Sequence, residues 1–287
     1  MAALVAVLVA LGGLGACGSG DPSPPVARIR VVAGNFALAQ LVEAVGSGRV
    51  DVVDLSAGAP DDRRVTPSSA ERQQMQAAAL VVVVGDGYQP GVEEAAGTGP
   101  RVLSVLAALG TQPSPQFWLD PAAMKRATTL VAGALGASDP SGKVAYHDGA
   151  NNFTAVLGTL NIDFQSSLAD CQHKVVIVPD HAFAAVTRQN LLQLETLGPT
   201  AGAAPVARAV ASVRAHSLTT VYSEPPVTSS AIASVAAQTG TKVLALDTLD
   251  GPPPAGEPAH YPYFDRMEDD LARFSAGLQC PDTSTGP

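Results

Sequence analysis

The sequence predicts an α/β fold of two lobes, each with a mostly parallel sheet flanked by helices, joined by one long helix. Two observations lead to this prediction. Short apolar runs alternate with segments of helical spacing early in the chain and again late in it, which is the pattern of βαβ units. Between them, residues 121–170 contain no strand-like segment, so the connection between the lobes is expected to be helical.

The first lobe is predicted from a βαβαβ pattern. Residues 28–33 (RIRVVA) predict a strand, 36–46 (FALAQLVEAVG) a helix, and 49–55 (RVDVVDL) a second strand. The helix expected over 66–79 begins with Ser and Thr capping candidates and carries a glutamate in its first turn. Residues 80–85 (LVVVVG) are continuously apolar, which is typical of a parallel strand buried on both faces.

The second lobe repeats the alternation. Strands are predicted over 174–178 (KVVIV), 219–224 (TTVYSE) and 242–247 (KVLALD), with a helix over 229–240 between the last two. A terminal helix is expected just before residue 280. These segments place a second α/β lobe after the helical connector.

The connector sets the predicted domain boundaries. Residues 139–170 are interpreted as one linker helix, although they contain three glycines that each cost about 1 kcal/mol relative to alanine inside a helix. The first lobe is then expected over 28–138 and the second over 171–281.

The start of the chain predicts export. Residues 1–17 form an apolar run that is too short to span a bilayer, which is typical of a secretory signal. Its end, LGAC, resembles the lipobox of bacterial lipoproteins, so Cys17 is expected to be lipidated. The Gly/Ser/Pro-rich residues 18–27 predict a flexible tether. The protein is therefore expected to be lipid-anchored to the outer face of the cell membrane.

Composition excludes several functional classes. The chain has 287 residues, a net charge of −9 and only 15% charged residues, which suits a globular protein, and we expect a monomer. Nucleic acid is excluded as a partner because the Lys/Arg clusters that bind phosphates are absent from the sequence. The sequence also has no G-x-S-x-G, H-E-x-x-H or P-loop motif, so we expect no enzyme.

The cysteines predict one disulfide. If Cys17 carries lipid, Cys171 and Cys280 remain as an even pair in an oxidising compartment. We therefore expect a Cys171–Cys280 disulfide that ties the terminal helix to the second lobe.

Four segments in fixed order carry a family resemblance: PDDRRVTPSS at 60–69, FWLDP at 117–121, DHAF at 180–183, and EPPVTSSAIASVAAQTGTKVLALDTL at 224–249. Together they resemble the metal-binding solute-binding lipoproteins of zinc and manganese ABC importers. The resemblance runs from about residue 29 to residue 280. It implies a divalent metal ion in a cleft between the lobes, a rigid helical linker, and an ABC importer permease in the membrane as partner.

The resemblance also implies four metal ligands in loops after strands. The first His position of the family falls on Asp61, with Asp62 beside it, and the second on Gln116. The third falls on Asp180, or on His181 if the loop shifts by one residue, and the fourth on Asp247. Glu224, at another strand end, is a further candidate to face the cleft.

This donor set indicates an altered site. Zinc favours imidazole and thiolate, whereas carboxylate and amide oxygens suit manganese, magnesium or calcium. The metal, manganese or zinc, is left open by the sequence. The alternative is a metal-free lipoprotein that keeps the fold as an interaction module. It is left open because Asp61 and Asp62 also fit a turn, where Asp is frequent, and Gln116 also fits a plain surface or cleft amide.

Structural roles are expected for several nearby residues. Trp118 is predicted to pack between the lobes, and Asp120 to cap a helix that starts at Pro121. The remaining histidines have no matching partners and are expected at the surface: His147, His173, His216 and His260.

Overall fold

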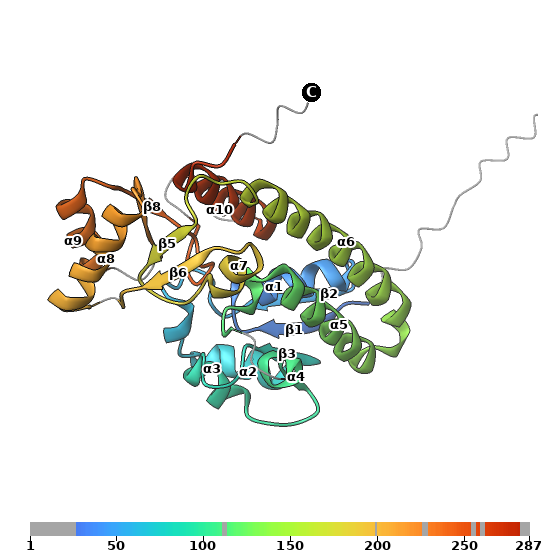
Figure 1. Ribbon diagram of the computed structural model, residues 1–287. Coiled ribbons are helices and arrows are strands. Elements are labelled where there is room, and N and C mark those ends of the chain that lie inside the picture. Colours follow the sequence, from blue (N-terminus) through green and yellow to red (C-terminus); the bar gives the residue numbers. More distant parts are fainter. Residues whose placement is uncertain are drawn as a thin grey trace, which may run out of the picture.

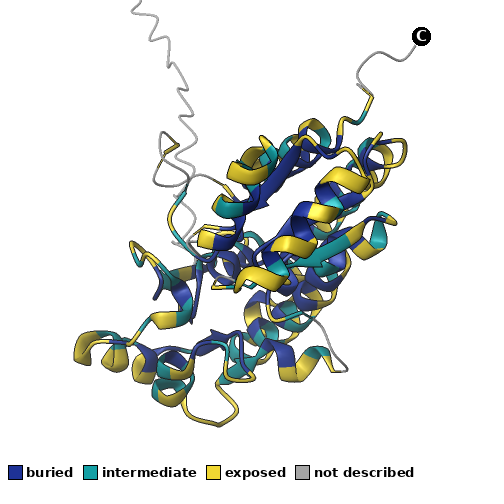
Figure 2. Ribbon diagram, turned by 60° about the vertical axis from the view of Figure 1, so that its left-hand side comes forward, coloured by how far each residue is buried: buried dark blue, intermediate teal, exposed yellow. Residues whose placement is uncertain are grey.

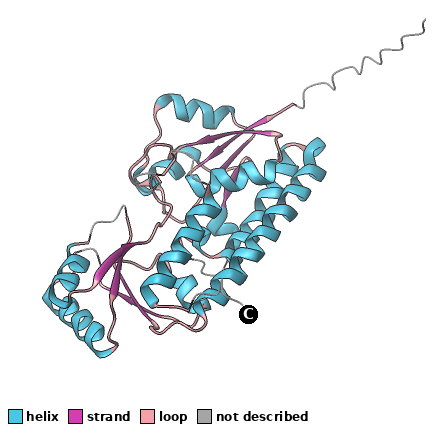
Figure 3. Cartoon of the chain, turned by 90° about the horizontal axis from the view of Figure 1, so that it is seen from above, coloured by secondary structure: helices cyan, strands magenta, loops and turns pink. Residues whose placement is uncertain are grey.

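The fold is described from a computed structural model. It covers residues 27–110, 114–198, 200–225, 229–253, 257–258 and 262–281. The predicted signal (1–17), its Cys17, nearly all of the tether (18–27) and His260 lie outside the described residues. Figures 1 and 3 show two lobes set side by side, with long helices running along them both.

A parallel sheet in the order β2-β1-β3-β4 forms the centre of the first lobe. Its strands are β1 Ile29–Ala33, β2 Val50–Asp54, β3 Leu80–Val83 and β4 Val102–Ser104. All four residues of β3 are buried, as expected for a strand covered on both faces. The short strand β4 was not predicted.

Helices cover both faces of this sheet. Val32 and Val81 pack against the helices α2 Ser69–Ala77 and α3 Pro90–Ala96, whereas their neighbours Val31 and Val82 pack on the opposite side, towards α1 Phe36–Gly46. This alternation follows from the twofold period of a strand. The helix start predicted near residue 68 is confirmed, since Ser68 and Glu71 form a capping box at α2. A short helix, α4, spans Val105–Leu109.

Two long helices pack against each other beside the first sheet, and the second of them joins the lobes. Asp120 caps α5 Pro121–Ser138 through its side chain, as predicted. The region 139–170 consists of a 3-10 turn at Pro140–Gly142 followed by α6 Lys143–Leu168. Helix α6 packs against α5 and α1 in the first lobe and against α10 Tyr263–Leu278 in the second. One long helix therefore joins the lobes, as the sequence predicts.

The second lobe holds two parallel strand pairs that adjoin through β5 and β7. The pairs are β5 Val175–Val178 with β6 Gln193–Thr196, and β7 Thr220–Ser223 with β8 Lys242–Ala245. The helices α8 Ala203–Ala215 and α9 Ser230–Thr239 pack together in one apolar cluster of this lobe. A short helix, α7, spans Ala184–Gln189.

One apolar core extends through both lobes. It runs from the first sheet through α5 and α6 to Met267 and Phe274 of α10. Figure 2 shows the same arrangement, with buried strands and helix faces enclosed by exposed outer surfaces. A shared core of this kind favours a fixed relation between the lobes.

The predicted disulfide is confirmed. Cys171, just beyond α6, is bonded to Cys280, just beyond α10. Backbone bonds reinforce the junction, since His173 N–H donates to the carbonyl of Leu278 at 3.0 Å. Within the described part of the chain, no helix is long and apolar enough to cross a membrane.

Candidate functional site

A hollow of about 470 Å³ opens where the carboxyl ends of strands from both lobes face one another. Such strand ends are the usual ligand-binding edge of open α/β sheets. Three of the predicted site residues reach this hollow: Gln116 from the first lobe, and Asp180 and His181 from the second. Its described lining residues are Arg63, Asp86, Gly87, Tyr88, Leu106, Ser114, Pro115, Gln116, Asp180 and His181.

Buried carboxylates lie beside the hollow. Asp62, Glu224 and Asp250 are each at most 2% exposed. The hydroxyl of Tyr88 donates to Oδ1 of Asp250 at 2.8 Å and lies 3.5 Å from Oδ1 of Asp62, so it connects the two acids. Gln116 Nε2 donates to Oδ2 of Asp250 at 3.4 Å.

Burial governs the protonation of these acids. Burial raises the pKa of Glu224 to about 8. Burial, followed by repulsion between the two carboxylates, raises the pKa of Asp62, and burial likewise raises that of Asp250. The group therefore holds protons near neutral pH that a bound cation would displace.

Glu224 keeps one oxygen free. Its Oε2 accepts the backbone N–H of Asp180 at 2.8 Å, whereas its Oε1 is buried without a hydrogen-bond partner. The side chain of Asp180 accepts the backbone N–H of His181 at 2.7 Å. The His181 ring is exposed and its Nε2 lies 3.4 Å from Oγ1 of Thr196. Glu224 therefore lies behind Asp180 and is not itself among the described residues that line the hollow.

Asp61 is engaged by arginines. It precedes a 3-10 helix at Asp62–Arg64 and caps it through its side chain. Its Oδ1 accepts from Arg63 Nε at 3.0 Å, and its Oδ2 lies 3.3 Å from Nη2 of Arg63 and 3.3 Å from Nε of Arg64. Both oxygens of this predicted ligand are thus already paired with positive charge.

Asp247 forms a buried ion pair with Arg266. Nε and Nη2 of Arg266 donate to its two oxygens at 2.6 and 2.7 Å, and both residues are at most 9% exposed. Asp247 also accepts the N–H of Leu249 at 2.9 Å, and Leu249 adopts a left-handed backbone with φ of 59°. Asp247 therefore shapes the turn that carries Asp250 towards the cleft.

The loops of the two lobes are joined behind the hollow. The N–H of Asp62 donates to the carbonyl of Asp250 at 2.7 Å. Trp118, fully buried, donates from Nε1 to the carbonyl of Thr248 at 3.0 Å. The prediction that Trp118 packs between the lobes is confirmed.

The structure does not gather all five predicted ligands. Among the described residues, no three His, Cys, Asp or Glu side chains are arranged to hold a metal ion as they stand. Gln116, Asp180 and His181 share the hollow, whereas Asp61 and Asp247 sit in ion pairs. The expectation for His173 was wrong, because it is only 6% exposed.

Sequence reasoning missed three residues of this site: Arg63, Tyr88 and Asp250. Asp250 follows Asp247 by three positions in the same strand-end loop, which is a signal that could have identified it. Tyr88 belongs to GDGYQPG, a segment that reads only as a turn. Arg63 was missed because the family resemblance places a metal ligand at the neighbouring Asp61 and assigns no role to an arginine in this loop.

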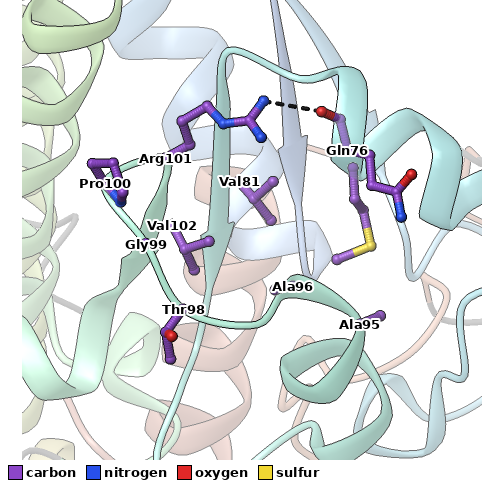
Figure 4. Close-up of a pocket in the computed structure, with 10 residues that line it drawn as sticks. Gln76, Val81, Ala95, Ala96, Thr98, Gly99, Pro100, Arg101 and Val102 are labelled. Atoms are coloured by element: carbon purple, nitrogen blue, oxygen red, sulfur yellow. Dashed lines mark hydrogen bonds between the residues drawn. The ribbon is translucent and has the colours of Figure 1, made fainter.

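A second hollow, of about 180 Å³, lies in the first lobe between α2, α3, β3 and β4. Figure 4 shows its lining, including Val81, Ala95 and Val102, with Arg101 at one side. The guanidinium of Arg101 donates to the carbonyls of Gln76 and Ala78. Because the Arg101 guanidinium is already hydrogen-bonded to backbone carbonyls, this hollow has fewer polar groups available to a ligand than the interlobe hollow has.

Comparison with known proteins gives consistent results. The family model for the periplasmic component A of zinc-uptake complexes, ZnuA, matches residues 31–277. No curated protein sequence matches the chain. The solved Zn(II)-bound ZnuA-like domain of Streptococcus pneumoniae AdcA is 16% identical, with a TM-score of 0.74 over 88% of this chain and 99% of that one.

Two further solved structures share this fold. The metal-dependent lipoprotein YcdH of Bacillus subtilis is 20% identical, with a TM-score of 0.75 over 88% of this chain and 99% of its own. The laminin-binding protein Lmb of Streptococcus agalactiae is 18% identical, with a TM-score of 0.75 over 87% and 99%. At these identities the likeness establishes the architecture of two lobes and a connecting helix.

Proposed function

This chain belongs to the ZnuA family, the periplasmic component A of zinc-uptake complexes, and on that premise we propose that it is an extracytoplasmic receptor that binds a divalent metal ion and delivers it to an ABC importer. The family consists of binding components of transporters, which are not enzymes. The solved proteins of the same fold include a Zn(II)-bound domain and a metal-dependent lipoprotein. The metal is cargo in this proposal.

The acidic cluster beside the interlobe hollow is the observation that most supports this function. Asp62, Glu224 and Asp250 place three buried carboxyl groups at a strand-end edge, and Glu224 Oε1 has no partner. A cation compensates such charge better than protons do, because it interacts with several carboxylates at once. The cluster therefore suits a positively charged ligand.

The donor chemistry favours a hard ion. We propose that manganese is preferred over zinc, because carboxylate, amide and phenol oxygens outnumber the single imidazole of His181. Gln116 and Asp180, which line the hollow, are proposed as further ligands with His181. Asp61 and Asp247 would join them only by leaving their arginine partners.

The proposed location follows from the start of the chain. A lipid on Cys17 and the tether over 18–27 would hold the receptor at the outer face of the cell membrane. The receptor would there act as a monomer beside its permease. Export of a Cys17→Ala variant into the soluble fraction would support this anchor, and unchanged membrane association would contradict it.

Metal analysis and calorimetry test the function directly. Protein purified without chelator should contain manganese or bind it in titration, and Asp250→Asn should weaken that affinity by about tenfold or more. Glu94→Gln, at an exposed position of α3, is the control and should not change it. Tight stoichiometric zinc would reject the hard-ion preference. Binding of neither metal would instead favour the metal-free interaction module.

A further inference from the structure

Arg63 brings a permanent positive charge into the cleft. It lies in the 3-10 helix at Asp62–Arg64, and its side chain is 26% exposed. It lines the hollow together with Tyr88, Gln116 and Asp180. Of the described residues that form this lining, Arg63 is the one whose charge is positive at every physiological pH.

The guanidinium is held in place by Asp61. The carboxylate accepts from Nε and Nη2 of Arg63 at 3.0 and 3.3 Å, and its Oδ1 also accepts the Arg63 backbone N–H at 3.1 Å. Two parallel contacts of this kind fix the orientation of a guanidinium. The positive charge of Arg63 therefore has a fixed position at the cleft.

The acids of the cleft respond to this charge. Arg63 lowers the pKa of Asp62, Glu224 and Asp250, although burial outweighs it in each case. It therefore already supplies part of the charge compensation that a bound cation would supply. A divalent ion entering beside it meets a like charge in a partly dehydrated space, where electrostatic repulsion is stronger than in bulk water.

We propose that Arg63 limits the metal affinity of the cleft by acting as a tethered cation that a divalent metal ion must displace. This inference rests on the proposed function, since it concerns the cargo of the same site. It predicts that the protein binds free metal ions more weakly than its acidic cluster alone would. Removing the charge should therefore increase metal affinity, the opposite of what is expected for a ligand.

Arg64 supplies a matched control. It also pairs with Asp61, at 3.3 Å, but its side chain is 87% exposed and is absent from the lining of the hollow. Water screens an ion pair at that exposure. The two neighbouring arginines therefore share a partner and differ in whether their charge reaches the cleft.

The experiment is calorimetric titration of Mn²⁺ into chelator-free parent, Arg63→Gln, Arg63→Lys and Arg64→Gln proteins. Arg63→Gln should bind Mn²⁺ about tenfold more tightly or better, because a charge has left the site. Arg63→Lys keeps the charge and loses the two-pronged contact, so it should retain the parental affinity. Arg64→Gln should change affinity by less than about twofold. Thermal melting curves establish that each variant is folded.

The outcomes separate this inference from the proposed function. The tethered-cation proposal is supported if Arg63→Gln is the only one of the four proteins that binds Mn²⁺. It is also supported if the parent binds Mn²⁺ and Arg63→Gln binds it clearly more tightly. Equal affinities in parent and Arg63→Gln, or an equal gain in Arg63→Lys or Arg64→Gln, overturn it while leaving the metal receptor intact. Binding by none of the four proteins overturns both.

Discussion

Replacing Glu224 by glutamine should stabilise the protein at alkaline pH and have little effect at acidic pH. The side chain is 1% exposed, and only one of its oxygens has a hydrogen-bond partner. Burial raises its pKa from 4.5 to about 8. Glutamine has nearly the same shape and, like the protonated acid, no charge to bury.

The sign and size follow from proton linkage. Between the two pKa values the folded state binds a proton that the unfolded chain has released, so stability falls as pH rises through this window. At about 1.36 kcal/mol per pKa unit, the loss between about pH 5 and about pH 9 is on the order of 4 kcal/mol. The glutamine variant escapes this loss, and the difference in unfolding free energy should grow by that amount.

Urea unfolding of chelator-treated protein at both pH values measures this difference. The control is Glu94→Gln on α3, whose side chain is exposed. It should show no comparable growth. An equal gap between parent and Glu224→Gln at both pH values would refute the reasoning, as would a parent that is the more stable protein at high pH.

Three further predictions concern the stability of the fold and use the same unfolding measurement. Replacing Cys171 and Cys280 by serine should cost up to about 4 to 5 kcal/mol for a separation of 109 residues, and no loss would contradict a stabilising disulfide. Gly149→Ala should destabilise the protein by about 1 to 3 kcal/mol, because the added Cβ would lie 2.5 Å from the Val45 carbonyl oxygen. Gly158→Ala in the same helix should instead stabilise it by up to about 1 kcal/mol. Similar effects at both glycines would argue against the close α1–α6 contact. Arg266→Met should cost about 3 to 5 kcal/mol because it leaves a buried aspartate unpaired, and a neutral result would exclude a buried ion pair.

Most of the fold could be predicted from the sequence because its main strands are continuous apolar runs. β3 and β5 are both buried along their whole length, and such runs have few alternative interpretations. β4 and β6 were missed for two different reasons, one of length and one of composition. β4 has only three residues, and β6 reads QLET, whose polar side chains are tolerated because none of its residues is fully buried.

The site was harder to predict because a ligand needs free oxygens as well as the right position. Asp247 has the expected position at a strand end, but its oxygens are bound by Arg266, which follows 19 residues later in the helix α10. No local pattern in the sequence indicates that α10 delivers a guanidinium to this point. Asp250, in the same loop, reaches the cleft because the ion pair fixes the turn before it.

The disulfide closes the second lobe into a covalent ring. Cys171 stands at the start of that lobe and Cys280 at its end, so the chain between them is fastened to itself at one point. A protease that cuts any single loop inside the ring would leave both fragments on one molecule, held in register by the intact bond. Cuts in the loops of the first lobe, which lie outside the ring, would leave fragments joined by packing alone. The second lobe should therefore keep its shape after a nick that would let pieces of the first lobe separate.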